Sequence, residues 1–185
     1  MPMLERIDRV DYRLCRTCNQ ALQWRGVHIF FSAISRMGDG PVWYLLMSAL
    51  PVYALATQTS KGFYAGGSLM VAGVIGLMVY RFLKTRLARE RPFISHQDIN
   101  CQNVPLDRYS FPSGHTLHAV MFTTIALAWF PALAGLLVPL TCLIALSRLV
   151  LGLHYPTDVV VGALLGFGLA QYVLFLLPPM AQTLG

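Results

Sequence analysis

Five long apolar runs follow residue 40, and short breaks rich in polar residues, proline or glycine separate them. They cover residues 41–57, 62–83, 116–131, 133–151 and 158–177. A helix crosses the hydrocarbon core of a bilayer with about 17–25 residues. The third run is short for this, so we expect its helix to start earlier, near Ser113. The pattern predicts an all-α, polytopic transmembrane helical bundle with about five spanning helices.

The N-terminal 40 residues have a different pattern. Residues 4–18 place apolar and charged side chains on opposite sides of a helix. Such a helix suits a membrane surface, or it packs on its own protein, and both alternatives stay open. Residues 21–37 are apolar but contain Arg25, His28 and Arg36, so we expect this segment to be interfacial rather than spanning. Residues 1–40 are therefore predicted to form an interfacial N-terminal segment.

The last apolar run contains three glycines, at positions 162, 166 and 168. Small residues allow two membrane helices to approach closely, so we expect this helix to pack tightly on a neighbour. No internal repeat interrupts the chain, and its 185 residues suit a single membrane domain.

Composition supports the membrane interpretation. Only 12% of the residues are charged, against about 25% in an ordinary soluble domain. The formal net charge of +6 would suggest nucleic acid in a soluble protein. Beside these apolar runs, the same charge indicates anionic membrane lipids or phosphate as partners, and no nucleic acid.

The four cysteines do not form a recognisable metal or redox motif. Cys15 and Cys18 make a single CxxC, and no second pair of ligands at zinc-site spacing follows. We therefore interpret both as small apolar residues on a helix face.

Most remaining polar residues lie in two joints, the loop 84–115 and the turn 148–158. Two predicted spans separate the joints, so both should lie at the same side of the membrane. The first supplies Lys84, Arg91, Ser113, Gly114 and His115, and the second supplies Arg148, His154 and Asp158.

This set of residues suits phosphoryl transfer, in which catalysis is mainly positioning and stabilisation of charge. Arg91 and Arg148 can each donate to two phosphate oxygens, and Lys84 adds a point charge. Ser113 and Gly114 precede an apolar run, where the free N–H groups of a starting helix bind anions.

The two histidines can divide the chemistry. Asp158 follows His154 by four residues, and a carboxylate on one imidazole nitrogen fixes the tautomer that leaves the other nitrogen free to attack. We therefore expect His154 to be the nucleophile and His115 to be the general acid.

The three segments Lys84-x6-Arg91-Pro92, Pro112-Ser113-Gly114-His115 and Ser147-Arg148-x5-His154-x3-Asp158 resemble the three motifs of the type 2 phosphatidic acid phosphatase family. That family shares its site with vanadium-dependent haloperoxidases. The resemblance implies a phosphohistidine on His154, acid catalysis by His115, support from Asp158 and phosphate binding by the other five residues. It also implies that no metal or other cofactor is needed, and an oligomer is not required. Neither joint has a carboxylate cluster suited to Mg²⁺.

For other polar residues near the joints, two interpretations stay open. Arg86, Arg89 and Arg108 are expected either to bind an anionic headgroup or to face water and lipid phosphates. Asp107 either shapes the substrate entrance or is an ordinary solvated loop residue.

The predicted function is hydrolysis of a phosphate monoester or pyrophosphate on a lipid. Phosphatidylglycerophosphate, phosphatidic acid, undecaprenyl pyrophosphate and lipid A phosphates all fit, and the sequence does not choose among them. Two alternatives belong to other classes, a vanadate-dependent peroxidase and an anion transporter or channel. The apolar runs argue against the first, and charges at span ends rather than at mid-membrane argue against the second.

Two arguments bear on which face of the membrane holds the site, and they disagree. The positive-inside rule assigns the strongly basic face to the cytoplasm. Several of those cations are expected to bind phosphate, however, and many bacterial relatives act at the periplasmic leaflet. We predict a multi-pass protein of a bacterial inner membrane with its site facing the periplasm.

Overall fold

The computed structural model describes residues 2–101, 105 and 107–179, with side chains from residue 5 onward. The described chain is helical and contains no strand, which confirms the all-α prediction. Its α-helices are α1 (Pro2–Asn19), α2 (Arg25–Gly38), α3 (Pro41–Thr57), α4 (Lys61–Arg86), α5 (Pro92–Ser95), α6 (Gly114–Trp129), α7 (Ala134–Val150) and α8 (Pro156–Leu176). Short 3₁₀ helices at Gln20–Gln23 and Pro131–Leu133 precede α2 and α7.

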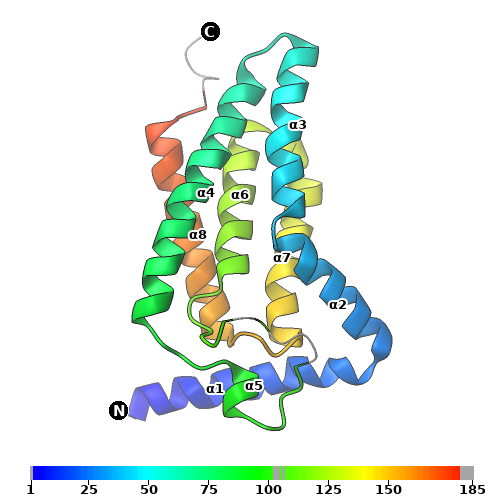
Figure 1. Ribbon diagram of the computed structural model, residues 1–185, viewed down its shortest axis with the longest axis vertical. Coiled ribbons are helices and arrows are strands. Elements are labelled where there is room, and N and C mark those ends of the chain that lie inside the picture. The colour runs from blue at the N-terminus through cyan, green and yellow to red at the C-terminus, as the bar shows by residue number, and fades with distance from the viewer. Residues whose placement is uncertain (1, 102–104, 106, 180–185) are drawn as a thin grey trace.

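Figure 1 shows that α3, α4, α6, α7 and α8 run side by side along the long axis, while α1 lies across one end. The loop from α4 to α6 and the turn from α7 to α8 meet at that same end. Both joints therefore lie at the same end of the bundle, as their expected place at one side of the membrane requires. We call this the α1 end of the bundle.

Membrane-spanning capacity is clear for three helical segments of the described chain. Lys61–Arg86, Pro131–Val150 and Pro156–Leu176 are long and apolar enough to cross a bilayer. The pair α2 and α3 also qualifies as one broken span, bent by 47°. By itself α6 has 16 residues, just below the usual minimum of about 17. The membrane bundle is confirmed with three or four candidate spans, and the count of five remains a prediction.

The bundle packs around α6, which contacts α4, α7 and α8. Leu117, Met121 and Ile125 on α6 are completely buried. The tightest approach is to α8, where a Cβ on Gly162 would lie 2.6 Å from the Ser113 carbonyl oxygen. A Cβ on Gly166 would lie 2.3 Å from the Leu117 carbonyl oxygen. These two glycines confirm the predicted close packing.

The prediction fails at Gly168, because a Cβ there would have no neighbour within 4 Å. A helix turns by about 100° per residue, so Gly168 lies on a different face of α8 from Gly162 and Gly166. Only residues four apart share the seam with α6.

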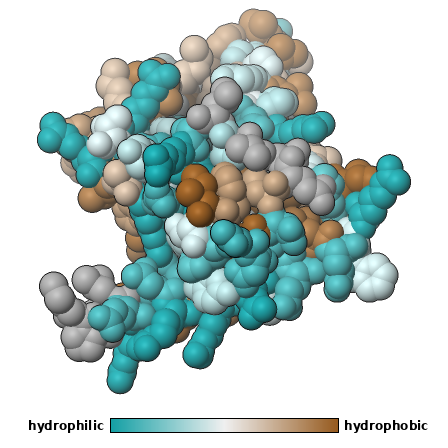
Figure 2. Space-filling view, turned by 60° about the horizontal axis from the view of Figure 1, so that its bottom comes forward, coloured by the Kyte–Doolittle hydropathy of each residue, from teal (hydrophilic) through white to brown (hydrophobic). Residues whose placement is uncertain are grey.

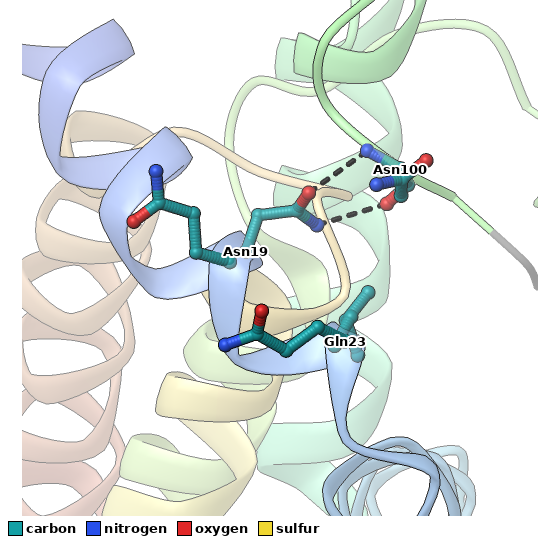
Figure 3. A pocket seen from close by; sticks show the side chains of 5 residues that line it. Asn19, Gln23 and Asn100 are labelled. Carbon is teal, nitrogen blue, oxygen red and sulfur yellow. Dashed lines mark hydrogen bonds between the residues drawn. The ribbon is translucent and has the colours of Figure 1, made fainter.

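The helix α1 packs on its own protein, which is one of the two alternatives that its sequence left open, while contact with a membrane surface remains a prediction. Asp11, Cys15 and Asn19 are buried against the rest of the protein, whereas Val10 and Leu14 are exposed apolar side chains. Figure 3 shows the Asn19 amide exchanging two hydrogen bonds with the backbone of Asn100, each 2.8 Å long. Hydrophilic side chains gather at this end of the molecule (Figure 2). Thus α1 is fixed to the α1 end through the face that carries Asp11, Cys15 and Asn19.

Candidate active site

The two joints enclose one pocket of about 640 Å³ at the α1 end of the bundle. Six of the eight predicted site residues line it, together with side chains from α2, α4 and the loops. The lining residues are Ser32, Ser35, Arg36, Asp39, Tyr80, Lys84, Arg91, Pro105, Asp107, Gly114, His115, Arg148, Leu151, Leu153 and His154. The structure therefore brings together side chains up to 70 positions apart in the two motif-bearing joints, Lys84 to His154.

His154 lies in the short connection between α7 and α8 and is almost fully buried. Its Nδ1 is 3.7 Å from Oδ2 of Asp158, and its Nε2 is 3.4 Å from Nη1 of Arg91. An arginine can only donate, so this geometry favours a proton on Nδ1 and a free lone pair on Nε2. Burial, followed by the charges of Arg148, Arg91 and Lys84, holds the pKa of His154 well below its usual value. The imidazole is therefore neutral near pH 7.

Asp158 is completely buried in the first turn of α8. Its Oδ2 accepts a 2.8 Å hydrogen bond from the backbone N–H of Tyr155, and its Oδ1 accepts one of 3.0 Å from Arg89. The backbone carbonyl of Asp158 accepts from the N–H of Ser113 at 3.1 Å. These bonds hold the carboxylate beside His154 and connect the two joints directly.

His115 lies in the first turn of α6, on the pocket wall. Its Nε2 is 2.5 Å from Oδ1 of Asp39, at the break between α2 and α3. The second histidine therefore also has a carboxylate neighbour, which comes from the segment before the first motif. Sequence reasoning did not assign Asp39 to the site, since 75 residues separate it from its partner.

The three predicted phosphate-binding cations all line the pocket. In the structure, Asp107 bonds to both Arg91 and Lys84, and its Oδ2 is 2.9 Å from Lys84 Nζ. Burial would raise the pKa of the Asp107 carboxyl, but these two bonds outweigh it and hold the pKa below its usual value. Arg148 bonds to the hydroxyl of Ser35. The Asp107 carboxylate thus forms ion pairs with two of the three cations. Of the two expectations for Asp107, the place at the pocket is the one that the structure shows.

Ser113 and Gly114 differ in their placement. Gly114 lines the pocket, and a Cβ there would lie 2.7 Å from the ring of Tyr80, so this close packing requires glycine. Ser113 is completely buried, and its hydroxyl lies 3.0 Å from that of Thr116 within the same helix start. The side chain of Ser113 is therefore not part of the pocket wall, unlike the other phosphate-binding candidates.

Comparison with known proteins agrees with this arrangement. Residues 61–179 match the PAP2 superfamily, and the match includes both joints. The chain belongs to the PAP2 superfamily.

Several relatives of the chain are named as phosphatases. The chain is 30% identical to the decaprenylphosphoryl-5-phosphoribose phosphatase of Mycobacterium tuberculosis, over 89% of each protein. It is also 30% identical to an undecaprenyl-diphosphatase of Sulfolobus acidocaldarius, over 80% of this chain and 68% of that one. Among solved structures, Aquifex aeolicus LpxE superposes with a TM-score of 0.69 at 28% identity, covering 90% of this chain and 95% of LpxE.

Besides Asp39, two residues at the site of this PAP2 chain were missed or misjudged by sequence reasoning. Tyr80 lies one helical turn before Lys84, and its hydroxyl accepts a 2.6 Å hydrogen bond from Lys84 Nζ. Arg89 was expected to bind headgroups or face water, but it bonds to Asp158 and to α1. The spacing of Tyr80 and Lys84 on a helix was an available signal. Nothing local to Arg89 indicated its partners.

Cys15 is the other potential nucleophile near the site, since its Sγ lies 3.8 Å from the backbone oxygen of His154. Burial raises the pKa of its thiol to about 12. The thiol is therefore protonated at neutral pH, and it packs as a small apolar group, as predicted. In the part of the chain that the structure describes, no group of three His, Cys, Asp or Glu residues has the geometry of a metal site.

Proposed function

We propose that this chain is an integral membrane phosphatase that hydrolyses a phosphate monoester or pyrophosphate on a lipid through a phosphohistidine on His154. The observation that carries the proposal is the shared pocket. It combines a buried neutral imidazole, a second histidine on the opposite joint and three cations. Anionic phosphate fits that charge, and a pocket at the end of an apolar bundle suits a substrate whose tails remain in lipid.

In the first step, the substrate phosphate replaces the Asp107 carboxylate on Lys84 and Arg91 and also contacts Arg148. The lone pair on Nε2 of His154 attacks phosphorus, and the bond to the leaving oxygen breaks as His115 protonates that oxygen. Asp158 stabilises the positive charge that develops on the ring, as the aspartate does in a catalytic triad. Asp39 orients His115 for this transfer, and its charge favours the protonated ring against burial and the nearby Arg148, which lower the pKa of His115.

In the second step, water attacks the phosphorus of the phosphohistidine while His115 takes a proton from it. The N–P bond breaks, neutral His154 returns and inorganic phosphate leaves. Throughout both steps the fixed cations stabilise the equatorial oxygens, which is the main requirement of phosphoryl transfer. Because protein groups supply this charge, we propose that the reaction needs no metal.

The substrate class follows from the pocket and from the relatives. A volume of about 640 Å³ exceeds what a single phosphate needs, so part of a headgroup also fits. The two curated relatives act on prenyl-linked substrates, one a phosphate on a sugar and one a diphosphate. We therefore propose polyprenyl-linked phosphates as the first class to test, ahead of phosphatidylglycerophosphate, phosphatidic acid and lipid A phosphates.

The deciding experiment is phosphate release from a panel of these lipids in mixed detergent micelles. We expect turnover of at least one lipid, no loss with a chelator, and inhibition by orthovanadate, which mimics five-coordinate phosphorus. The His154→Ala protein serves as the blank for contaminating phosphatases. Inactivation by the chelator that Mg²⁺ reverses would disprove metal independence.

The same preparation separates the two alternative functions. Vanadate-dependent oxidation of bromide without lipid hydrolysis would indicate a peroxidase. Phosphate uptake into proteoliposomes without hydrolysis would indicate a transporter. Either result would overturn the proposed phosphatase activity.

We further propose that the α1 end faces the periplasm of a bacterial inner membrane. A test uses a variant without its native cysteines and with one new cysteine, either Gln97→Cys at the α1 end or Thr59→Cys at the opposite end. Both positions are exposed. In cells with a permeabilised outer membrane, an impermeant thiol reagent should label the first variant and not the second. The reverse result would assign the site to the cytoplasm.

A further inference from the structure

Arg89 connects the first helix of the chain to the carboxylate that supports His154. Its Nη1 donates to Asp158 Oδ1 at 3.0 Å and to the hydroxyl of Thr157 at 2.7 Å. Its Nη2 donates to Asp11 Oδ2 at 2.8 Å and to Asp8 Oδ1 at 3.1 Å. The guanidinium carbon also lies 4.0 Å from the centre of the Tyr155 ring. A single side chain thus joins α1 to the first turn of α8.

Asp11 is the buried end of this connection. Its Oδ1 accepts a 3.0 Å hydrogen bond from the backbone N–H of Thr157, and its Oδ2 also accepts from the Thr157 hydroxyl. The backbone N–H groups in the first turn of a helix have no partner within the helix, and negative charge there is stabilising. Asp11, which belongs to α1, therefore caps the start of α8. The residue that it binds, Thr157, directly precedes Asp158.

The charged groups around His154 determine how strongly Asp158 can support it. Cations or histidines face its ring from four elements, namely Lys84 on α4, Arg91 before α5, His115 on α6 and Arg148 on α7. Asp158 on α8 is the carboxylate beside the ring. Without a further anion, Arg89 would partly neutralise the charge of Asp158. Asp158 would then stabilise an imidazolium or phosphohistidine at His154 less strongly. Asp11, on the far side of Arg89, balances that guanidinium and leaves Asp158 negative toward His154.

We propose that Asp11 is a positioning residue for catalysis. It acts through Arg89 and Thr157 to hold the Asp158 carboxylate in position and negatively charged beside His154. It does not touch the pocket, and its effect is on His154. This inference rests on the proposed role of His154 as nucleophile. It assigns to α1, which precedes the three motifs, a part in the chemistry.

Asp8 offers a matched control on the same helix. It bonds to the same Nη2 of Arg89, but its side chain is 70% exposed, whereas that of Asp11 is 2% exposed. Water screens an exposed pair strongly, so Asp8 should contribute little. The substitutions Asp11→Asn and Asp8→Asn each remove one charge and keep the shape of the side chain.

The first measurement is steady-state hydrolysis in detergent micelles, with a lipid shown to be turned over. We expect Asp11→Asn to lower kcat about tenfold to a hundredfold. This is the range typical of residues that orient a metal ligand through a hydrogen bond without touching the metal. KM should stay within about twofold, because no phosphate contact is lost. Asp8→Asn should lower kcat by less than about twofold.

The second measurement does not depend on activity. Nitrogen chemical shifts of ¹⁵N-labelled His154, assigned with the His154→Ala variant, report which ring nitrogen carries the proton at pH 7.5. We expect Nδ1–H in the unmodified protein and in Asp8→Asn, and a detectable fraction of Nε2–H in Asp11→Asn. This readout separates failure of the inference from failure of the proposed phosphatase activity, since the tautomer is observed even without a turned-over lipid.

A double-mutant cycle tests whether Asp11 acts through Arg89. If it does, Asp11→Asn should have less than about twofold further effect on kcat when Arg89→Gln is already present. Additive losses would overturn the proposed route. A lowered thermal stability of Asp11→Asn with unchanged kcat and unchanged ¹⁵N shifts would show that Asp11 only fastens α1, and would overturn the inference as a whole.

Discussion

The floor and the mouth of the pocket use carboxylates in different ways. At the floor, Asp158 lies behind His154 and outside the pocket lining, where it is completely buried and receives bonds from the backbone of Tyr155 and from Arg89. At the mouth, the side chains of Asp39 and Asp107 are 55% and 47% exposed. Asp39 contacts His115, while Asp107 contacts Lys84 and Arg91.

The difference indicates a division of roles. A buried charge is screened little and has one geometry, so Asp158 can fix a tautomer and support a charge that forms during the reaction. Exposed carboxylates are screened by water, and they can move when a phosphate enters. The floor should therefore control the chemical step strongly, and the mouth should tune proton transfer and binding by smaller factors. Four substitutions test this contrast.

The largest effect is expected at His154. Its replacement in His154→Ala removes the only group proposed to form the covalent intermediate, and loss of a nucleophile costs up to about 10⁶-fold in turnover. Brief reaction with labelled substrate and an alkaline quench should leave label on the unmodified protein and none on the variant. His96→Ala, outside the pocket lining, is the control. Substantial turnover by His154→Ala would end the phosphohistidine proposal.

The second effect concerns the carboxylate at the floor. We expect Asp158→Asn to lower kcat by about 10⁴-fold, as for the aspartate of a triad, because the amide no longer stabilises the charged ring. Thermal unfolding in detergent should show that the variant is folded. A loss of less than tenfold would make Asp158 structural and would remove the contrast between floor and mouth.

At the mouth, Asp39→Asn should lower kcat about tenfold for an alkyl phosphate, a part of what general acid catalysis contributes. The loss should be smaller for p-nitrophenyl phosphate, whose leaving group needs little protonation. His115→Asn should show the same dependence on the leaving group with a larger loss. Equal losses on both substrates would mean that Asp39 does not act through proton transfer.

The smallest effect is expected for Asp107→Asn. Removing this charge frees Lys84 and Arg91 for an anion, so orthovanadate should inhibit about twofold to fivefold more strongly, the range for a partly exposed ion pair. The measurement is the inhibition constant for orthovanadate, with Asp98→Asn as a control in the same loop. Weaker inhibition by vanadate would show that Asp107 helps to build the anion site instead of competing for it.

The sequence by itself determined the helices and the two joints, and it supplied the candidate side chains for the proposed reaction. Apolar runs depend on local order along the chain, so α3 has the bounds predicted for its run and α6 begins at Gly114, near the expected start. The motif residues could be proposed as site residues because their chemistry is specific and their spacing is short, as for His154 and Asp158. The two histidines were expected to meet, since two spans separate the joints.

Only the tertiary structure decided which partners those side chains have. Asp39 and His115 are 76 positions apart, and Asp11 and Arg89 are 78 apart, so no periodicity relates them. Asp11 also looks like one more charge on a surface helix, yet it is buried. A buried carboxylate requires donors, and these come from Arg89 and Thr157, which only the packing of α1 against the start of α8 brings within reach. Local pattern specifies the elements, whereas the contacts between distant elements set the charges around His154.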